Sequence, residues 1–169
     1  MSNTELRPAL RGEPRIVVGV DGSRSSIGAL QRGVRLASAL ELPLEAVAVW
    51  QYPNVYGGYM GEAFVPSTMD LSAGAQAMLD DTTSAVFGTA TPPSWFHGSV
   101  REGGTARTLL DESEGAEMLI VGSRGHGGFT GLLLGSVSET CAEHATCPVL
   151  VFHDGPPAES AAAALPAAA

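Results

Sequence analysis

The glycine-rich stretch over residues 122–138 contains the residue types that commonly hold phosphate groups. Gly122 and Gly125 would allow the backbone to turn sharply and to approach a ligand closely. Residues 135–138 are expected at the start of a helix, where free N–H groups and the positive end of the helix dipole attract anions. Arg124 is the only fixed positive charge in the stretch and could bind a phosphate through two parallel hydrogen bonds. The stretch therefore predicts a phosphate-binding loop.

The same residues have a second explanation that needs no ligand. Ser136 and Glu139 have the spacing of a capping box, in which each side chain satisfies a backbone N–H at the start of a helix. Glycines that follow a strand also serve ordinary turns. Glu139 would moreover lie one turn from the phosphates, which is unfavourable unless a cation lies between them. From these residues alone, both explanations stay open.

The charge of the chain excludes several classes of function. Its net charge is −9, and all nine basic residues are arginines, so lysine is absent. A Walker-type phosphate loop needs a lysine beside the phosphates, which excludes ATPases and kinases of that class. An acidic surface without a basic stripe argues against nucleic acid or an anionic membrane as the main partner.

The cysteines and histidines predict neither a disulfide framework nor a metal centre. Cys141 and Cys147 do not have C-x-x-C spacing, and we expect two reduced, buried thiols. The histidines, which show no metal-ligand spacing, are His97, His126, His144 and His153. His126 is the nearest candidate for a general base, and it is equally explained as a solvated loop residue. We therefore expect no dedicated catalytic site and no metal held by the protein alone.

Five short apolar runs alternate with segments of helical periodicity. The runs predict strands over residues 15–21, 44–50, 95–100, 116–121 and 147–152. The segments between them predict helices over residues 25–37, 67–86, 106–113 and 136–145. This alternation predicts one doubly wound, Rossmann-like α/β domain, with a five-stranded parallel sheet of order 3-2-1-4-5 and helices on both faces.

In such sheets, ligands bind beyond the carboxyl ends of the strands, at the point where the strand order reverses. The expected order brings Asp21, after the first strand, beside Gly122, after the fourth. Asp21 could contact a ligand there, or it could simply cap the following helix or turn. The two loops that are unusual in sequence are thus the two that the fold would place at the ligand site.

The domain is expected to cover residues 15–153. Residues 1–14 are expected to be flexible, and the Pro- and Ala-rich residues 154–169 to be disordered. The N-terminus lacks the apolar core of a secretory signal and no apolar run is long enough to cross a bilayer, so we expect a cytoplasmic location. The long loop over residues 51–66, rich in Gly and Tyr, could cover the site as a lid or present aromatic side chains to another protein.

Taken together, these motifs resemble a known family. Gly122-x-x-Gly125, nine further residues and then Gly135-Ser136 reproduce the ATP-binding signature of universal stress proteins, spacing included. The segment 20–23 is similar to that family's first strand and turn, and the segment 147–151 to its closing strand. The resemblance covers about residues 15–152, and it implies the doubly wound fold expected above.

The resemblance also implies an ATP site. Asp21 would meet the ribose or the adenine, the main chain of Val49 would hold the adenine edge, and residues 135–138 would bind the outer phosphates. Mg²⁺ or Mn²⁺ is expected to bridge those phosphates, because one arginine cannot balance a triphosphate in an acidic protein. The implied nucleotide-binding residues are Gly19, Val20, Asp21, Val49, Val121, Gly122, Arg124, Gly125, Gly135, Ser136, Val137 and Ser138.

The resemblance further implies an ATP-dependent sensor or switch in a stress response. It also implies a homodimer that pairs through the last strand (Val149, Leu150, Val151 and Phe152). Slow ATP hydrolysis or autophosphorylation at Ser136 or Ser138 is a second hypothesis. The remaining alternatives are a protein-interaction module that binds no nucleotide and a flavin- or adenylate-handling domain. The segment Asp21-Gly22-Ser23-Arg24-Ser25 differs from the Ser-Gly-Gly-x-Asp-Ser loop of ATP pyrophosphatases, which weighs against adenylation.

Overall fold

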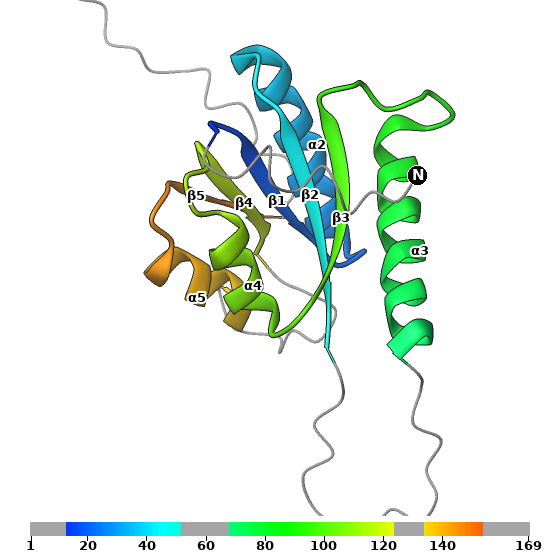
Figure 1. Ribbon diagram of the computed structural model, residues 1–169. Coiled ribbons are helices and arrows are strands. Elements are labelled where there is room, and N and C mark those ends of the chain that lie inside the picture. The colour runs from blue at the N-terminus through cyan, green and yellow to red at the C-terminus, as the bar shows by residue number, and fades with distance from the viewer. Residues whose placement is uncertain (1–12, 52–67, 124–133, 154–169) are drawn as a thin grey trace, which may run out of the picture.

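A computed structural model describes residues 13–51, 68–123 and 134–153 of the chain. Strands and helices alternate along it (Figure 1). In chain order, they are β1 (Ile16–Val20), α2 (Arg24–Leu40), β2 (Leu44–Trp50), α3 (Thr68–Phe87), β3 (Phe96–Glu102), α4 (Thr105–Glu112), β4 (Met118–Gly122), α5 (Ser136–His144) and β5 (Val149–Phe152).

The five strands form one parallel sheet in the order β3-β2-β1-β4-β5. Ile16 of β1 is in register with Leu44 of β2 on one side and with Met118 of β4 on the other. The strand order reverses between β1 and β4, so the carboxyl ends of these two strands meet at one edge of the sheet. The expected fold class and strand order are confirmed.

Helices cover both faces of the sheet, because the strands are apolar on both sides. Alternate residues of β1 point to opposite faces: Val18 packs in the cluster under α2 and α3, whereas Val17 packs in the cluster under α4 and α5. Leu79 of α3 and Leu109 of α4 close the two clusters from opposite sides. The sheet is therefore the middle layer of three (Figure 1).

The predicted element boundaries differ from the observed ones by a few residues. Arg15 precedes β1 rather than belonging to it, β3 extends to Glu102, and β5 begins at Val149, after Pro148. Proline lacks the N–H that a strand donates to its neighbour, which explains the late start of β5.

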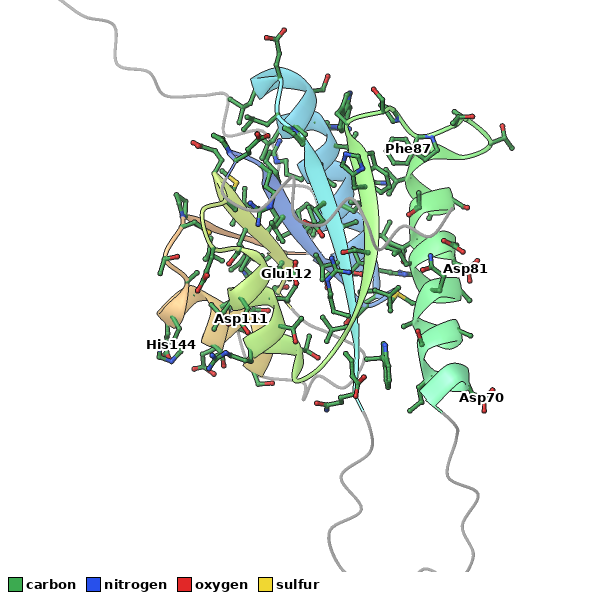
Figure 2. All side chains as sticks on the ribbon, viewed as in Figure 1. Asp70, Asp81, Phe87, Asp111, Glu112 and His144 are labelled. Atoms are coloured by element: carbon green, nitrogen blue, oxygen red, sulfur yellow. The ribbon has the colours of Figure 1, made fainter. Side chains whose placement is uncertain are left out.

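Four charged side chains form a buried network on the α4 side of the sheet. Arg101 donates from Nη2 to Oε1 of Glu45 and from Nε to Oε1 of Glu112, at 3.1 Å each (Figure 2 labels Glu112). Arg15 donates from Nη2 to the carbonyl oxygen of Glu112 at 2.7 Å, and Ser99 donates to Glu45 at 2.9 Å. Two guanidinium groups thus balance two carboxylates, which makes their burial tolerable. The apolar runs that predicted the strands did not indicate this network.

No helix in the described parts of the chain is both long and apolar enough to span a bilayer.

Candidate functional site

A tight turn connects β1 to α2 at the sheet edge where the strand order reverses. Gly22 has φ 79°, a left-handed conformation that glycine adopts at little cost. Asp21 stabilises the turn, because its Oδ1 accepts a hydrogen bond from the backbone N–H of Ser23 at 3.0 Å. Ser23 then caps α2 by accepting from the N–H of Ser26 at 3.2 Å. Of the two structural roles considered for Asp21, the turn is observed, and the helix cap belongs to Ser23.

Gly122 ends β4 directly beside the first turn of α2. A Cβ atom built on Gly122 would lie 2.5 Å from Oγ of Ser25 and 3.0 Å from the carbonyl carbon of Ser25. Glycine is therefore required here for the close approach of β4 and α2, independently of any role in ligand binding. This packing role was not expected from the glycine pattern.

The N-terminus of α5 lies next to the end of β4. Gly135 is the N-cap, with extended backbone at φ −79° and ψ 158°, and none of the described side chains caps the helix. Ser136 is consequently the first helical residue and is exposed, so the predicted capping box between Ser136 and Glu139 does not form. The prediction was wrong because it placed the helix start one residue too late, and a capping box needs its serine at the N-cap. Within the described residues, this helix end therefore has no side-chain cap hydrogen bond, and Glu139 is the acidic residue of its first turn.

Ser138 has a different environment from Ser136, although both lie in the first turn of α5. Ser138 is buried at 3% exposure, and its Oγ donates to the carbonyl oxygen of Gly122 at 2.6 Å. Its hydroxyl proton is thus committed to the end of β4.

The other predicted site residues lie along the strands. Gly19 faces α4, where a Cβ would lie 2.8 Å from Cδ1 of Leu109, and Val121 packs in the same layer. Val20 belongs to the core under α2 and α3 and is in register with Ala48 of β2. Val49 is the residue after Ala48, near the end of β2. The side chains of Val20 and Val121 are in the core, so a ligand could reach only their main chain.

Of the predicted site, the structure brings together the Asp21 turn, Gly122 and the start of α5. Val137 is half-buried in that first turn, where it packs against the α5-side core. Arg124 and Gly125 lie outside the described residues, as do most of residues 51–66.

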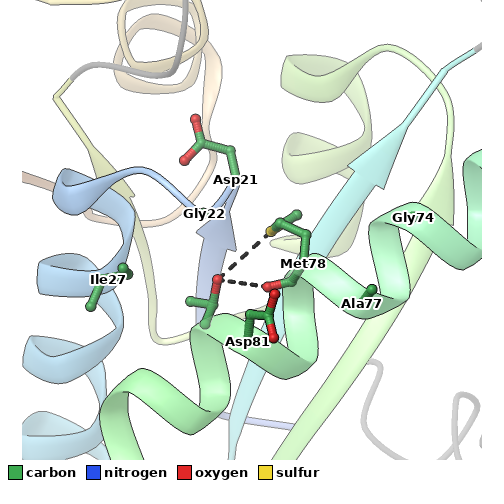
Figure 3. A pocket seen from close by; sticks show the side chains of 8 residues that line it. Asp21, Gly22, Ile27, Gly74, Ala77, Met78 and Asp81 are labelled. Carbon is green, nitrogen blue, oxygen red and sulfur yellow. Dashed lines mark hydrogen bonds between the residues drawn. The ribbon is translucent and has the colours of Figure 1, made fainter.

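A pocket of about 600 Å³ opens between α2 and α3 beside the same turn (Figure 3). Its lining residues are Asp21, Gly22, Ile27, Gly74, Ala77, Met78, Asp81 and Thr82. Thr82 donates its hydroxyl hydrogen bond within α3, to the carbonyl oxygen of Met78 at 2.8 Å. The side chain of Asp21 points away from α3 in Figure 3. The small residues Gly74 and Ala77 of α3 form part of the pocket wall, and their pattern in the sequence did not predict a pocket.

Among the described residues, the carboxylates of Asp21, Asp81 and the exposed Glu139 lie near this edge, and the exposed Arg24 begins α2 beside the Asp21 turn. No group of three or more His, Cys, Asp or Glu side chains that could hold a metal ion occurs among the described residues.

An open parallel α/β sheet, whose strand order reverses between β1 and β4 and whose faces are both covered by helices, defines a Rossmann-like α/β fold. The sequence pattern of the Universal stress protein family matches residues 14–153. The chain therefore belongs to the Universal stress protein family, as its motifs indicated.

Similar mycobacterial proteins extend this finding. Universal stress protein Rv2005c of Mycobacterium tuberculosis is 32% identical over 159 residues, which cover 85% of this chain and 49% of that protein. Universal stress protein Rv2624c of the same organism is 33% identical over 148 residues, covering 84% of this chain and 50% of that protein. The chain thus spans about half the length of the curated relatives it matches.

Solved structures of lower identity share the fold. A universal stress protein in complex with cAMP has a TM-score of 0.60 at 23% identity, covering 85% of this chain and 99% of that chain. A universal stress protein from Archaeoglobus fulgidus in complex with dAMP has a TM-score of 0.57 at 16% identity, covering 83% of this chain and 98% of that one.

Proposed function

We propose that this chain binds ATP at the carboxyl edge of β1 and β4 and acts as a nucleotide-dependent sensor or switch in a stress response. The observation that carries the proposal is the start of α5. Its N-cap is a glycine, no described side chain caps this helix end, and the exposed Ser136 is the first helical residue. Backbone N–H groups and a hydroxyl at a helix N-terminus form a ready-made phosphate site.

The ligands of the neighbouring structures support an adenine nucleotide. cAMP and dAMP, bound by two universal stress proteins of the same fold, share an adenine, a sugar and a phosphate. ATP is the specific choice here because the spacing of Gly122, Gly125 and Gly135 reproduces the family's ATP-binding signature. Asp21 would then meet the ribose or adenine, and Arg124 would meet the phosphates.

In this proposal, the two serines in the first turn of α5 have different roles. Ser136 is exposed and can direct its hydroxyl to a phosphate, whereas the hydroxyl of Ser138 donates to Gly122. If the protein phosphorylates itself, the accessible acceptor in this turn is therefore Ser136. We propose slow hydrolysis or autophosphorylation only as a secondary activity of the switch.

A divalent cation fits the charges at this edge. Glu139 is exposed in the first turn of α5, where a triphosphate would otherwise repel it. Mg²⁺ or Mn²⁺ bound to phosphate oxygens, with Glu139 or Asp21 supplying a carboxylate, would turn this repulsion into attraction.

The site would work in a homodimer in the cytoplasm, as the family resemblance suggests. β5 is the last strand of the sheet, and its four apolar residues are each half-buried. Pairing through this edge would bury apolar surface that one chain leaves partly exposed. Sedimentation analysis with and without ATP would test whether the protein pairs and whether the nucleotide alters that pairing.

Isothermal titration of the purified chain with ATP and Mg²⁺ tests the nucleotide site. Ser136→Asp is the informative variant, because an acid at the first helical position favours the helix dipole, yet it removes the hydroxyl donor and places a carboxylate where the phosphate would lie. Ser84→Asp, at an exposed position of α3, is the control of equal charge. A Gly122→Glu variant would be less informative, since any Cβ there collides with Ser25 and disturbs the fold.

We expect wild type and Ser84→Asp to bind ATP, and Ser136→Asp to lose at least tenfold in affinity, with unchanged circular dichroism. Absence of binding heat at millimolar ATP, together with no co-purified nucleotide by mass spectrometry, would overturn the proposal. The protein would then be an interaction module of the same fold. A flavin would be evident from the colour of the purified protein.

A further inference from the structure

Ser138 joins α5 to the end of β4. Its Oγ donates to the carbonyl oxygen of Gly122 at 2.6 Å, and its side chain is almost fully buried. A second contact lies beside it, because the N–H of Gly135 donates to the carbonyl oxygen of Ser123 at 2.8 Å. The start of α5 is therefore attached to the end of β4 at two points.

The end of β4 is in turn packed against the start of α2. Gly122 approaches Ser25 so closely that a Cβ atom would not fit between them. Ser25 is buried at 6% exposure, and its Oγ lies 3.2 Å from Oγ of Ser23, within hydrogen-bond distance. The contacts thus continue from the strand into the first turn of the helix.

The same serines hold the turn that contains Asp21. The N–H of Ser23 donates to Oδ1 of Asp21 at 3.0 Å, and the N–H of Asp21 donates to Oγ of Ser26 at 3.3 Å. Ser26 also donates from its Oγ to the carbonyl oxygen of Ser23 at 3.0 Å. A continuous series of contacts therefore runs from Ser138 to Asp21. We call it the serine bridge; its residues are Ser138, Gly122, Ser25, Ser23, Ser26 and Asp21.

We propose that Ser138 is a positioning residue, which fixes the start of α5 relative to Asp21 through the serine bridge rather than by contacting the ligand. The effect on ligand binding rests on the proposed function, since the two ends of the bridge would hold opposite ends of one nucleotide. Binding sites gain affinity when such groups are held in place before the ligand arrives.

Three variants separate this role from direct contact. Ser138→Ala removes the hydroxyl and leaves the carbonyl oxygen of Gly122 without its donor. Ser138→Thr restores a hydroxyl at the same position, and Ser136→Ala removes the exposed hydroxyl from the same helix turn. Each full-length variant is measured by amide hydrogen exchange without ligand and by titration with ATP and Mg²⁺.

Ser138→Ala should speed exchange of the Gly135 amide about tenfold relative to the core amide of Ile120, and weaken ATP binding about tenfold, because the carbonyl oxygen of Gly122 loses this donor. Ser138→Thr should restore both values toward wild type. Ser136→Ala should weaken ATP binding without changing exchange at Gly135. Combining Ser138→Ala with Asp21→Asn should give an affinity loss different from the sum of the two single losses.

Unchanged exchange at Gly135 in Ser138→Ala would overturn the positioning role, whether or not ATP binds. Faster exchange with full ATP affinity would also overturn it, because the bridge would then be structural only. If the wild type binds no nucleotide, the proposed function fails by itself, and exchange at Gly135 still decides whether Ser138 holds α5 in place.

Discussion

Arg101 donates from Nη2 to Oε1 of Glu45 at 3.1 Å, with the two side chains only 11% and 9% exposed. Such a pair depends on both partners, because removing one leaves a buried charge without compensation. Arg107 and Asp111 form a comparable pair at 3.0 Å on the surface of α4, where the side chains are 82% and 51% exposed. The two arginines differ in burial and in their partners, because Arg101 donates to Glu112 as well as to Glu45, whereas Arg107 pairs with Asp111.

Arg101→Met is expected to lower the free energy of unfolding by about 3 kcal/mol, because Glu45 and Glu112 lose their shared cation while the chain keeps its apolar stem. Arg107→Met is expected to cost less than about 0.5 kcal/mol, since water screens the exposed pair. Urea unfolding followed by circular dichroism measures both values. Equal losses in the two variants would mean that burial does not set the strength of these pairs.

Two helical glycines should respond oppositely to substitution by alanine. Gly74 faces open space on α3, so Gly74→Ala should stabilise the protein by about 0.5–1 kcal/mol through helix propensity. Gly33 packs on the sheet, where a Cβ would lie 2.8 Å from Cγ2 of Val18, so Gly33→Ala should destabilise it by about 1–3 kcal/mol. Thermal unfolding should show a higher Tm for the first variant and a lower Tm for the second. A shift of both in the same direction would contradict the packing described for α2 or α3.

Cys141 should resist thiol reagents in the folded protein. Burial, with a smaller contribution from Cys147, raises the pKa of its thiol from 9.0 to about 11. The thiolate is the reactive form, so a disulfide reagent at pH 8 should modify the half-buried Cys147 and leave Cys141 until the protein unfolds. Mass spectrometry of peptides around both residues measures the two rates. Modification of both at equal rates in native conditions would contradict this expectation.

The raised pKa of Cys141 also predicts how stability depends on pH. The thiol of Cys141 loses its proton at a lower pH in the unfolded chain than in the folded one. Its contribution to the free energy of unfolding is therefore complete below pH 9 and is lost as the pH rises towards 11. Cys141→Ala should remove this part of the alkaline loss while lowering stability at neutral pH. Urea midpoints measured between pH 8 and 11 for both proteins make the comparison.

Glu139→Gln should make ATP binding less dependent on a divalent cation. In the presence of EDTA, the variant should bind ATP about two- to fivefold more tightly than the wild type, because one negative charge near the helix start is removed. With Mg²⁺ present, the variant should lose this advantage. Titration calorimetry under both conditions gives the four affinities, and an identical metal dependence would show that Glu139 does not face the phosphates.

The strands and their order could be predicted because they depend on local apolar runs and on general rules of parallel sheets. Val17 and Val18 are both buried although they face opposite layers, and a strand covered on both sides is the simplest origin of such a run. The same rules placed Asp21 beside Gly122, which the sheet order confirms.

The contacts within the candidate site could not be predicted in the same way. Ser136 and Ser138 look equivalent in the sequence, yet one is exposed and the other donates to Gly122, because Gly135 is the N-cap and the helix begins at Ser136. The close approach of Gly122 to Ser25 joins segments far apart in the chain, and no local pattern encodes that distance. The buried hydrogen bonds of Arg15 and Arg101 could not be predicted either, because a charged residue beside apolar ones does not indicate which residue it pairs with.

The backbone hydrogen bond from Gly135 to Ser123 has a consequence for engineering and for natural variation. It joins the two ends of the segment between these residues. The positions of the sheet and α5 therefore do not depend on the length of that segment. In general, doubling the length of a loop costs only about 0.6 kcal/mol of closure entropy. Foreign peptides could therefore be grafted between Ser123 and Gly135 to change what the domain recognises, while its scaffold stays as it is.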